Sequence, residues 1–180
     1  MEGGWIMKLF NNEQVLYITF DKQPQTRDRN ISPKDKFLAT KDKQGNIITL
    51  EADKKLYPFK IDNSVKCTIV TTVRTIEFTI PNQYRWNGAD IPKFMWALVG
   101  SRYNPEFKIP SMVHDIMLEF KEDIYSKLTN ISVAEYRRLT SLIFRQLLKD
   151  KGVGTIKSNI MSGAVQCYQT LFNRKGWQIG

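Results

Sequence analysis

Two different spacings of apolar residues divide the chain. In the first half, apolar and polar positions alternate with a period of two, which is typical of strands with one buried face. Beyond Pro92, apolar residues recur every three to four positions, as they do in helices. The strand-like runs cover residues 15–20, 47–50 and 65–80, and the last of them ends at Pro81. They predict an antiparallel β meander of about four strands.

The second half of the chain predicts about four helices. The candidate segments are residues 91–99, 110–122, 133–149 and 155–172. Ser132 and Glu135 form the S-x-x-E pattern of a capping box at the start of the third segment. Because the strands precede the helices, we expect an α+β fold with the helices packed on one face of the sheet. We expect a single domain over residues 1–180, mainly β in 1–81 and mainly α in 91–174.

The last predicted helix carries a stripe of apolar and small residues. These residues follow helical spacing and are Ile156, Ile160, Gly163, Ala164, Cys167, Tyr168 and Leu171. Its small residues lie where another helix could approach closely.

Composition narrows the function classes. The 180 residues include one His, two Cys, and 27 Lys plus Arg against 18 Asp plus Glu, a formal net charge of +9. A single imidazole excludes zinc sites of the H-E-x-x-H type and hydrolases that need clusters of His. Cys67 and Cys167 lack the C-x-x-C spacing, which argues against a disulfide framework and fits a reducing compartment. No apolar run reaches the ~18 residues of a membrane span.

The positive charge raises the question of a nucleic-acid partner. Basic side chains gather on the third predicted helix and just after it, at Arg137, Arg138, Arg145, Lys149 and Lys151. Glu135 and Asp150 interrupt them, and no known binding motif accompanies them. The excess of positive charge is also spread over both halves of the chain. This surface is therefore typical of an ordinary solvated helix, and it gives little support to a nucleic-acid partner.

Residues 86–92, W-N-G-A-D-I-P, stand between the predicted strands and helices. Asn87 and Gly88 form a turn pair, and Asp90 precedes Pro92 at a point where its side chain can cap a helix. A structural cap and turn is one interpretation. The other is a functional turn that presents Asn87 and Asp90 to a cleft at the end of a rigid sheet.

His114 and Asp115 lie in a predicted helix that is apolar around most of its circumference. Only a narrow sector that includes Ser111 is polar, so we expect a buried helix whose polar groups need partners. One interpretation is a structural His held by a carboxylate or a carbonyl. The other is a catalytic imidazole, the usual proton carrier near neutral pH.

The turn and the buried helix would form one site if they converge. Asp90 and Asp115 could then orient His114 as a general base, or bind a single divalent cation with Asn87 and water completing its shell. We therefore predict catalytic candidates at Asn87, Asp90, His114 and Asp115. A Cys67–His114 nucleophile pair is disfavoured, because Cys67 lies within a predicted strand and not at a helix N-terminus.

Several of these residues belong to a series of short motifs. In chain order the motifs are Pro81 with Tyr84, W-N-G-A-D-I-P at 86–92, M-V-H-D-I-M-L at 112–118, Arg137 with S-L-I-F at 141–144, and Gly176-Trp177. By these motifs, residues 65–177 resemble a family of small proteins of unknown function found in tailed bacteriophages and prophages. The pattern of that family is P-x-G-F-x-T-D-x-A-S-I-P, A-x-x-H-D-x-L-Y, R-x-x-A-D-x-I-F and G-W.

Three positions depart from the family pattern. Asn87 stands where the family has Asp, Asp90 where it has Ser, and Ser141 where its third motif has Asp. Two carboxylates are thus lost and one is gained nearby. If the family site is catalytic, this chain either uses Asp90 in place of the missing acid or has lost the activity.

The resemblance implies a phage context, either in the host cytoplasm or in the virion. The first hypothesis is a phage accessory protein whose hydrolase-like site acts on cell wall or another polymer during infection or lysis. The second is a non-catalytic virion or assembly component that binds another phage protein or DNA. In the second hypothesis, the pair of His114 and Asp115 joins helix to sheet.

Overall fold

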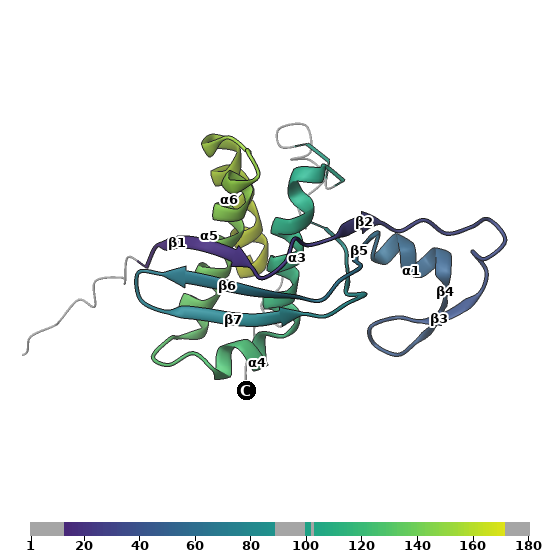
Figure 1. Ribbon diagram of the computed structural model, residues 1–180, viewed down its shortest axis with the longest axis horizontal. Coiled ribbons are helices and arrows are strands. Elements are labelled where there is room, and N and C mark those ends of the chain that lie inside the picture. Colours follow the sequence, from purple (N-terminus) through teal and green to yellow (C-terminus); the bar gives the residue numbers. More distant parts are fainter. Residues whose placement is uncertain (1–12, 89–99, 102, 172–180) are drawn as a thin grey trace, which may run out of the picture.

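The chain has a strand-rich N-terminal part and a helical C-terminal part, which confirms the α+β class (Figure 1). The computed structural model describes residues 13–88, 100–101 and 103–171, so the helix predicted at 91–99 lies outside the described residues. The strands are β1 (Val15–Phe20), β2 (Thr26–Asp28), β3 (Ala39–Lys41), β4 (Ile47–Thr49), β5 (Phe59–Ile61), β6 (Val65–Thr71), β7 (Thr75–Ile80) and β8 (Arg85–Trp86). The helices are α1 (Leu50–Leu56), α3 (Pro105–Glu119), α4 (Lys121–Ser126), α5 (Val133–Asp150) and α6 (Thr155–Leu171). Within these ranges, none of the helices has the length and apolar character needed to cross a membrane.

Strand β6 is the centre of the main sheet. It pairs antiparallel with β7, which follows it, and with β1 on its other side, so the order is β1-β6-β7. The strand-like run at 65–80 is therefore a hairpin that turns at residues 72–74. Alternate residues of β6, from Val65 to Thr71, are buried, while those between them are not. One face of this sheet consequently packs on the helices, and the other faces solvent.

The core lies between the main sheet and helices α3, α4 and α5 (Figure 1). Its members include Ile69, Ile76 and Ile80 of the sheet, Met112, Ile116 and Met117 of α3, Ile124 of α4, and Tyr136, Leu139 and Ile143 of α5. Burying each such side chain contributes about 1.5–3 kcal/mol. A smaller cluster joins α3, α5 and α6 through Phe107, Phe144, Leu148, Val153, Met161 and Val165. Helix α3 takes part in both clusters.

Helix α3 begins earlier than the spacing of apolar residues predicts. Its first residue is Pro105, and the side-chain oxygen of Asn104 caps it by accepting from the Glu106 N–H at 3.2 Å. Proline suits the first helical position because its missing N–H has no helical acceptor there. Pro110, the expected start, lies inside the helix. The early start adds Phe107 and Ile109 to the buried surface of α3.

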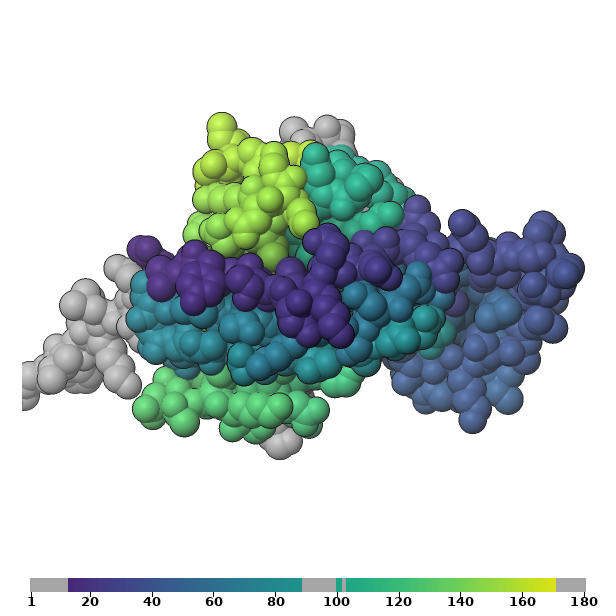
Figure 2. Space-filling model, viewed as in Figure 1, coloured from purple at the N-terminus to yellow at the C-terminus, as the bar shows by residue number. Residues whose placement is uncertain are grey.

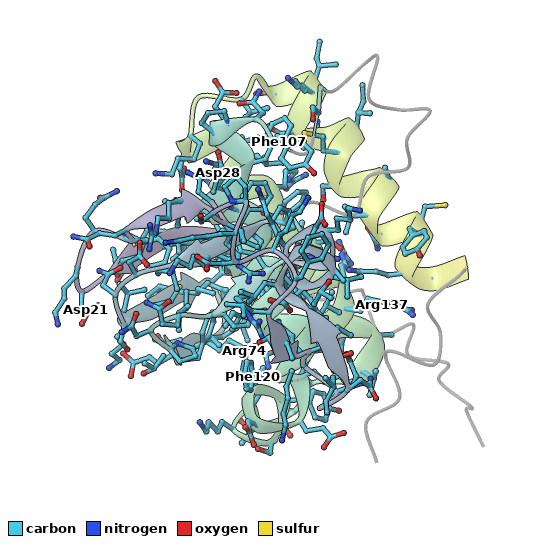
Figure 3. All side chains as sticks on the ribbon, turned by 90° about the vertical axis from the view of Figure 1, so that its right-hand side faces the viewer. Asp21, Asp28, Arg74, Phe107, Phe120 and Arg137 are labelled. Carbon is cyan, nitrogen blue, oxygen red and sulfur yellow. The ribbon has the colours of Figure 1, made fainter. Side chains whose placement is uncertain are left out.

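Residues 21–58, which we call the N-terminal lobe, project from one end of the main sheet (Figure 2). The lobe holds β2, which joins β5 and β8 in a second sheet, the β3–β4 hairpin, and α1. No aliphatic or aromatic side chain of the lobe belongs to the core clusters. The lobe is joined to the body by hydrogen bonds and ion pairs, such as that between Asp28 and Lys108 at 2.8 Å. Phe107, which precedes Lys108 in the chain, lies at the same end of the molecule as Asp28 (Figure 3).

Several residues of the apolar stripe on helix α6 are exposed. Ile156, Ile160 and Tyr168 are 79%, 39% and 40% exposed, and Cys167 is exposed as well. The inward face is formed by Met161 and Val165 together with Ser158, Ser162 and Gln169. These polar residues make specific bonds in the body; for example, the Ser162 hydroxyl donates to the Ser141 carbonyl at 2.8 Å. Helix α6 runs along the outer edge of the molecule (Figure 3), and the exposure of these apolar side chains places them on its outer face.

Helix α5 confirms the predicted capping box. The Ser132 hydroxyl accepts from the Glu135 N–H at 3.2 Å, and the Glu135 carboxylate accepts from the Ser132 N–H at 2.8 Å. The box satisfies backbone donors that have no partner within the helix. It sets the start of the helix whose buried side chains cover the sheet.

We expect Ser132→Ala to lower the free energy of unfolding by about 1 kcal/mol, because one of these donors loses its acceptor. Urea denaturation of both proteins measures the difference. Ser126→Ala provides the control, since the Ser126 hydroxyl only donates to the Asp123 carbonyl at a helix end. An equal loss in both variants would show that the capping box has no special role.

Candidate functional site

His114 lies where three helices meet. It belongs to α3 and is only 5% exposed. Its ring lies next to that of Phe144 on α5, with centroids 5.4 Å apart. On the side of α6, Nε2 of His114 is 2.7 Å from the side-chain nitrogen of Gln169. The imidazole is therefore a buried polar contact among α3, α5 and α6.

The two ring nitrogens of His114 face different partners. Nε2 of the ring pairs with the Gln169 side-chain amide, and the tautomer of the ring decides which of the two groups donates. Nδ1 lies 3.5 Å from Oδ1 of Asp115, at the long end of hydrogen-bond distance. Both nitrogens are thus directed at polar groups of the protein, as burial requires.

The structure brings together some of the four predicted site residues. His114 and Asp115 are in contact, as described. Asn87 directly follows Trp86, the last residue of β8. Nε1 of Trp86 donates to the hydroxyl of Ser111 at 3.1 Å, and Ser111 lies about one helical turn before His114 on α3. This bond holds the end of β8 close to α3. The Asn87 side-chain oxygen is buried. Asp90 lies outside the described residues, so the convergence of all four residues stays a prediction.

A cation site at these residues is also a prediction. Across the described ranges, no three His, Cys, Asp or Glu side chains gather closely enough to hold a metal ion. Asp115 and His114 supply two such groups, and Asn87 offers an amide oxygen. Asp90, the other carboxylate predicted for this site, lies outside the described residues.

Comparison with known proteins identifies the family. A family model described as a protein of unknown function, DUF1353, matches residues 61–165, which is more than half of the chain. The chain belongs to the DUF1353 family. No curated protein and no solved structure matches it. The expected relation to an uncharacterised family is confirmed, while the phage context and the individual motifs stay predictions.

The DUF1353 region contains His114 but not Gln169, its hydrogen-bond partner. His114, Asp115 and Asn87 lie inside the matched residues, whereas Gln169 lies beyond them. Gln169 is not among the predicted site residues, because it lies outside the apolar stripe of the last helix. Ser158, Ser162 and Gln169 share the opposite face at helical spacing. This spacing of polar residues in the sequence indicates a second face of the helix that could contact buried polar groups.

A second polar cluster of the DUF1353 region lies on α3 near Asp115. The Tyr84 hydroxyl donates to Oε2 of Glu119 at 2.9 Å, and Lys43 of the lobe forms an ion pair with the same oxygen. The Lys43 ammonium also lies 4.2 Å from the centre of the Tyr84 ring. Burial, followed by the charges of Asp115 and Glu119, raises the pKa of Tyr84 far above its usual value, so this hydroxyl acts as a donor.

The alternative Cys67–His114 nucleophile pair has no support in the DUF1353 fold. Cys67 is fully buried in the middle of β6, and burial raises the pKa of its thiol to about 12. The reactive thiolate is therefore scarce at neutral pH. Cys167, in contrast, is exposed on α6.

We expect Ellman's reagent to titrate one thiol in the folded protein and two in denaturant. Cys167 is exposed, whereas Cys67 is buried with its pKa raised to about 12. Cys167→Ser should leave no reactive thiol in the folded state. Rapid reaction of that variant would contradict the placement of Cys67 in the core.

We expect His114→Ala to lower the free energy of unfolding by about 2–4 kcal/mol, because it leaves a cavity and a buried Gln169 amide without its hydrogen-bond partner. His114→Gln should lose markedly less, since its own amide can form a hydrogen bond with Gln169 in place of the ring nitrogen. Urea denaturation at neutral pH compares the two variants with the parent protein. Equal stability of the parent and His114→Ala would contradict a packing role for the imidazole.

Proposed function

We propose that this DUF1353 chain is a non-catalytic component of a tailed-bacteriophage particle or of its assembly, present in the host cytoplasm or the virion, where it binds another phage protein or DNA. The observation that carries the proposal is the burial of His114, which is 5% exposed and contacts Gln169 at 2.7 Å. A polar side chain so enclosed specifies packing. In this role His114 and Asp115 fix α3 against α5 and α6.

The competing hypothesis is a hydrolase-like site at Asn87, Asp90, His114 and Asp115 that acts on cell wall or another polymer. A general base must come within hydrogen-bond reach of the proton that it removes, directly or through one water. The burial of His114 works against that requirement. The loss of a family carboxylate at Asn87 works in the same direction. The non-catalytic role is therefore the better supported of the two.

A variant that keeps the packing and removes the chemistry tests this proposal. We expect the double variant His114→Gln, Asp115→Asn, once shown to be folded by its thermal midpoint, to restore particle production to a prophage that lacks the gene. Gln169→Ala is the matched control, because it keeps both candidate catalytic side chains and removes only the partner of His114. Particle yield should follow thermal stability across these variants.

Two results would count against the proposal. The first is a stable double variant that fails to support particle production while a less stable Gln169→Ala succeeds, which would indicate chemistry at His114 or Asp115. The second is the absence of the chain from particles and from assembly intermediates, measured by immunoblotting across a density gradient. The first result favours the hydrolase hypothesis, and the second removes the structural role.

A further inference from the structure

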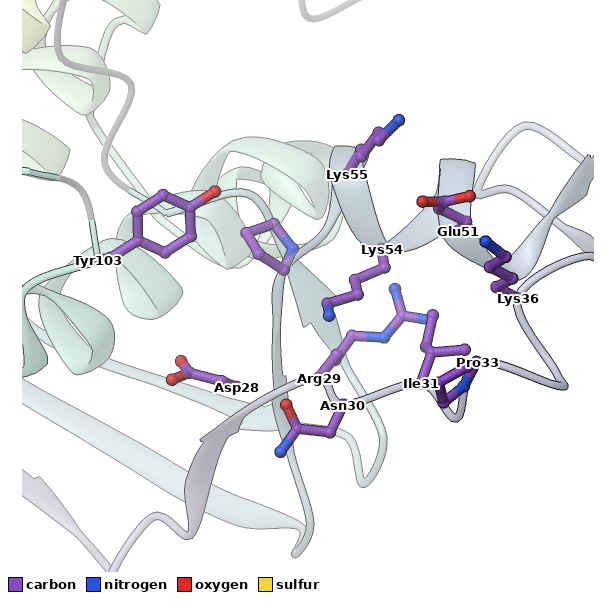
Figure 4. A pocket seen from close by; sticks show the side chains of 11 residues that line it. Asp28, Arg29, Asn30, Ile31, Pro33, Lys36, Glu51, Lys54, Lys55 and Tyr103 are labelled. Atoms are coloured by element: carbon purple, nitrogen blue, oxygen red, sulfur yellow. The ribbon is translucent and has the colours of Figure 1, made fainter.

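Two open pockets lie side by side where the lobe joins the body. The first has a volume of about 530 Å³ and lies between residues 28–36, helix α1 and Tyr103 (Figure 4). The second has a volume of about 560 Å³ and lies between residues 27–35 and the strand residues Lys60 and Arg85. Both pockets include Arg29, Asn30 and Ile31, so these residues form a ridge between them.

Positive charge predominates in the first pocket. It is lined by the cationic side chains of Arg29, Lys36, Lys54 and Lys55 and by the carboxylates of Asp28 and Glu51. The Arg29 and Lys54 side chains lie beside each other in the middle of the pocket (Figure 4). Asp28 forms an ion pair with Lys108 at 2.8 Å, and this pair offsets its negative charge. The pocket is therefore suited to an anionic ligand.

The second pocket also has more cations than carboxylates. It is lined by the cationic side chains of Arg27, Arg29, Lys60 and Arg85 and by the carboxylate of Asp35. Asp62 forms ion pairs with two of these cations, Arg27 at 2.5 Å and Lys60 at 3.2 Å. Burial tends to raise the pKa of Asp62, but hydrogen bonds from these two cations outweigh it and lower the pKa, so Asp62 is charged at neutral pH. The four cations of this pocket thus exceed by one the three carboxylates that line it or pair with them, which are those of Asp35, Asp53 and Asp62.

Asp53 holds the two remaining guanidinium groups in place. It is fully buried, and its Oδ2 accepts from Arg29 at 2.6 Å and from Arg85. Arg29 also donates to the backbone carbonyls of Asp53 and Tyr57, at 3.2 Å and 2.9 Å. These bonds fix Arg29 before any ligand arrives, which reduces the entropy lost on binding.

We propose that the two pockets bind phosphates of one nucleic-acid strand that crosses the ridge at residues 29–31. Cationic pockets on both sides of one ridge fit a chain of phosphates better than a single anion, and Arg and Lys are the side chains that recognise phosphate. Tyr103, at the wall of the first pocket, is 50% exposed and offers a ring on which a base can stack. The inference rests on the proposed function and names its partner.

Fluorescence anisotropy with a labelled oligothymidylate of about 20 nucleotides tests this site on the purified full chain. We expect Lys36→Glu, Lys54→Glu to weaken binding at least tenfold. We expect the slope of log affinity against log salt concentration to fall by about 1.4, since two phosphate contacts are lost. The matched control is Lys127→Glu, Lys151→Glu, which changes the net charge equally at two exposed positions outside both pockets. It should change binding less than twofold.

A second variant keeps the test decisive if the first is unstable. Lys55→Glu alters one exposed side chain and should weaken binding by several fold with an unchanged thermal midpoint. Equal losses in pocket and control variants, or no measurable binding by the parent chain, would overturn the inference. So would displacement of the oligonucleotide by poly-glutamate at equal charge, which would indicate an acidic protein partner. The proposed function is decided separately, in particles, so each can fail without the other.

Discussion

The burial of α3 is the constraint on which the rest of the structure depends. This helix packs against the sheet, α5 and α6, so its apolar residues enter both core clusters. Its polar residues consequently need partners inside the protein. Trp86 of β8 forms a hydrogen bond with Ser111, and Gln169 of α6 forms one with His114. The position of β8 and the orientation of α6 both follow from polar groups that α3 cannot expose.

The sequence predicted those helices and strands that are determined by residues close together in the chain. The capping box at Ser132 and the alternation in β6 depend on neighbouring residues, and both are present as expected. Helix α1 was missed because its seven residues hold too few apolar positions to show a period, although Thr49 was a recognisable cap. The start of α3 was misplaced because Pro110 looked like a first residue when a second proline, Pro105, had that role.

The candidate site was harder to predict, because its partners are distant in the chain. His114 and Gln169 are 55 positions apart, and only the packing of α6 on α3 brings them together. The same holds for the basic residues of the lobe. They are scattered among carboxylates in the sequence, and their shared carboxylates, Asp53 and Asp62, become evident only when the lobe is folded. Charge counted along the chain therefore underestimates charge gathered in space.

The polar attachment of the N-terminal lobe has a consequence for how this protein can diverge. Residues 21–58 supply no aliphatic or aromatic side chain to the core clusters, and the matched family region, residues 61–165, follows them in the chain. Within the lobe, β2 pairs with the core strand β5, whereas the β3–β4 hairpin pairs only within itself. Insertions or exchanges in the hairpin should therefore alter the packing of sheet and helices less than changes in β2, and the hairpin is the part of the lobe whose surface can change at least cost to the interior.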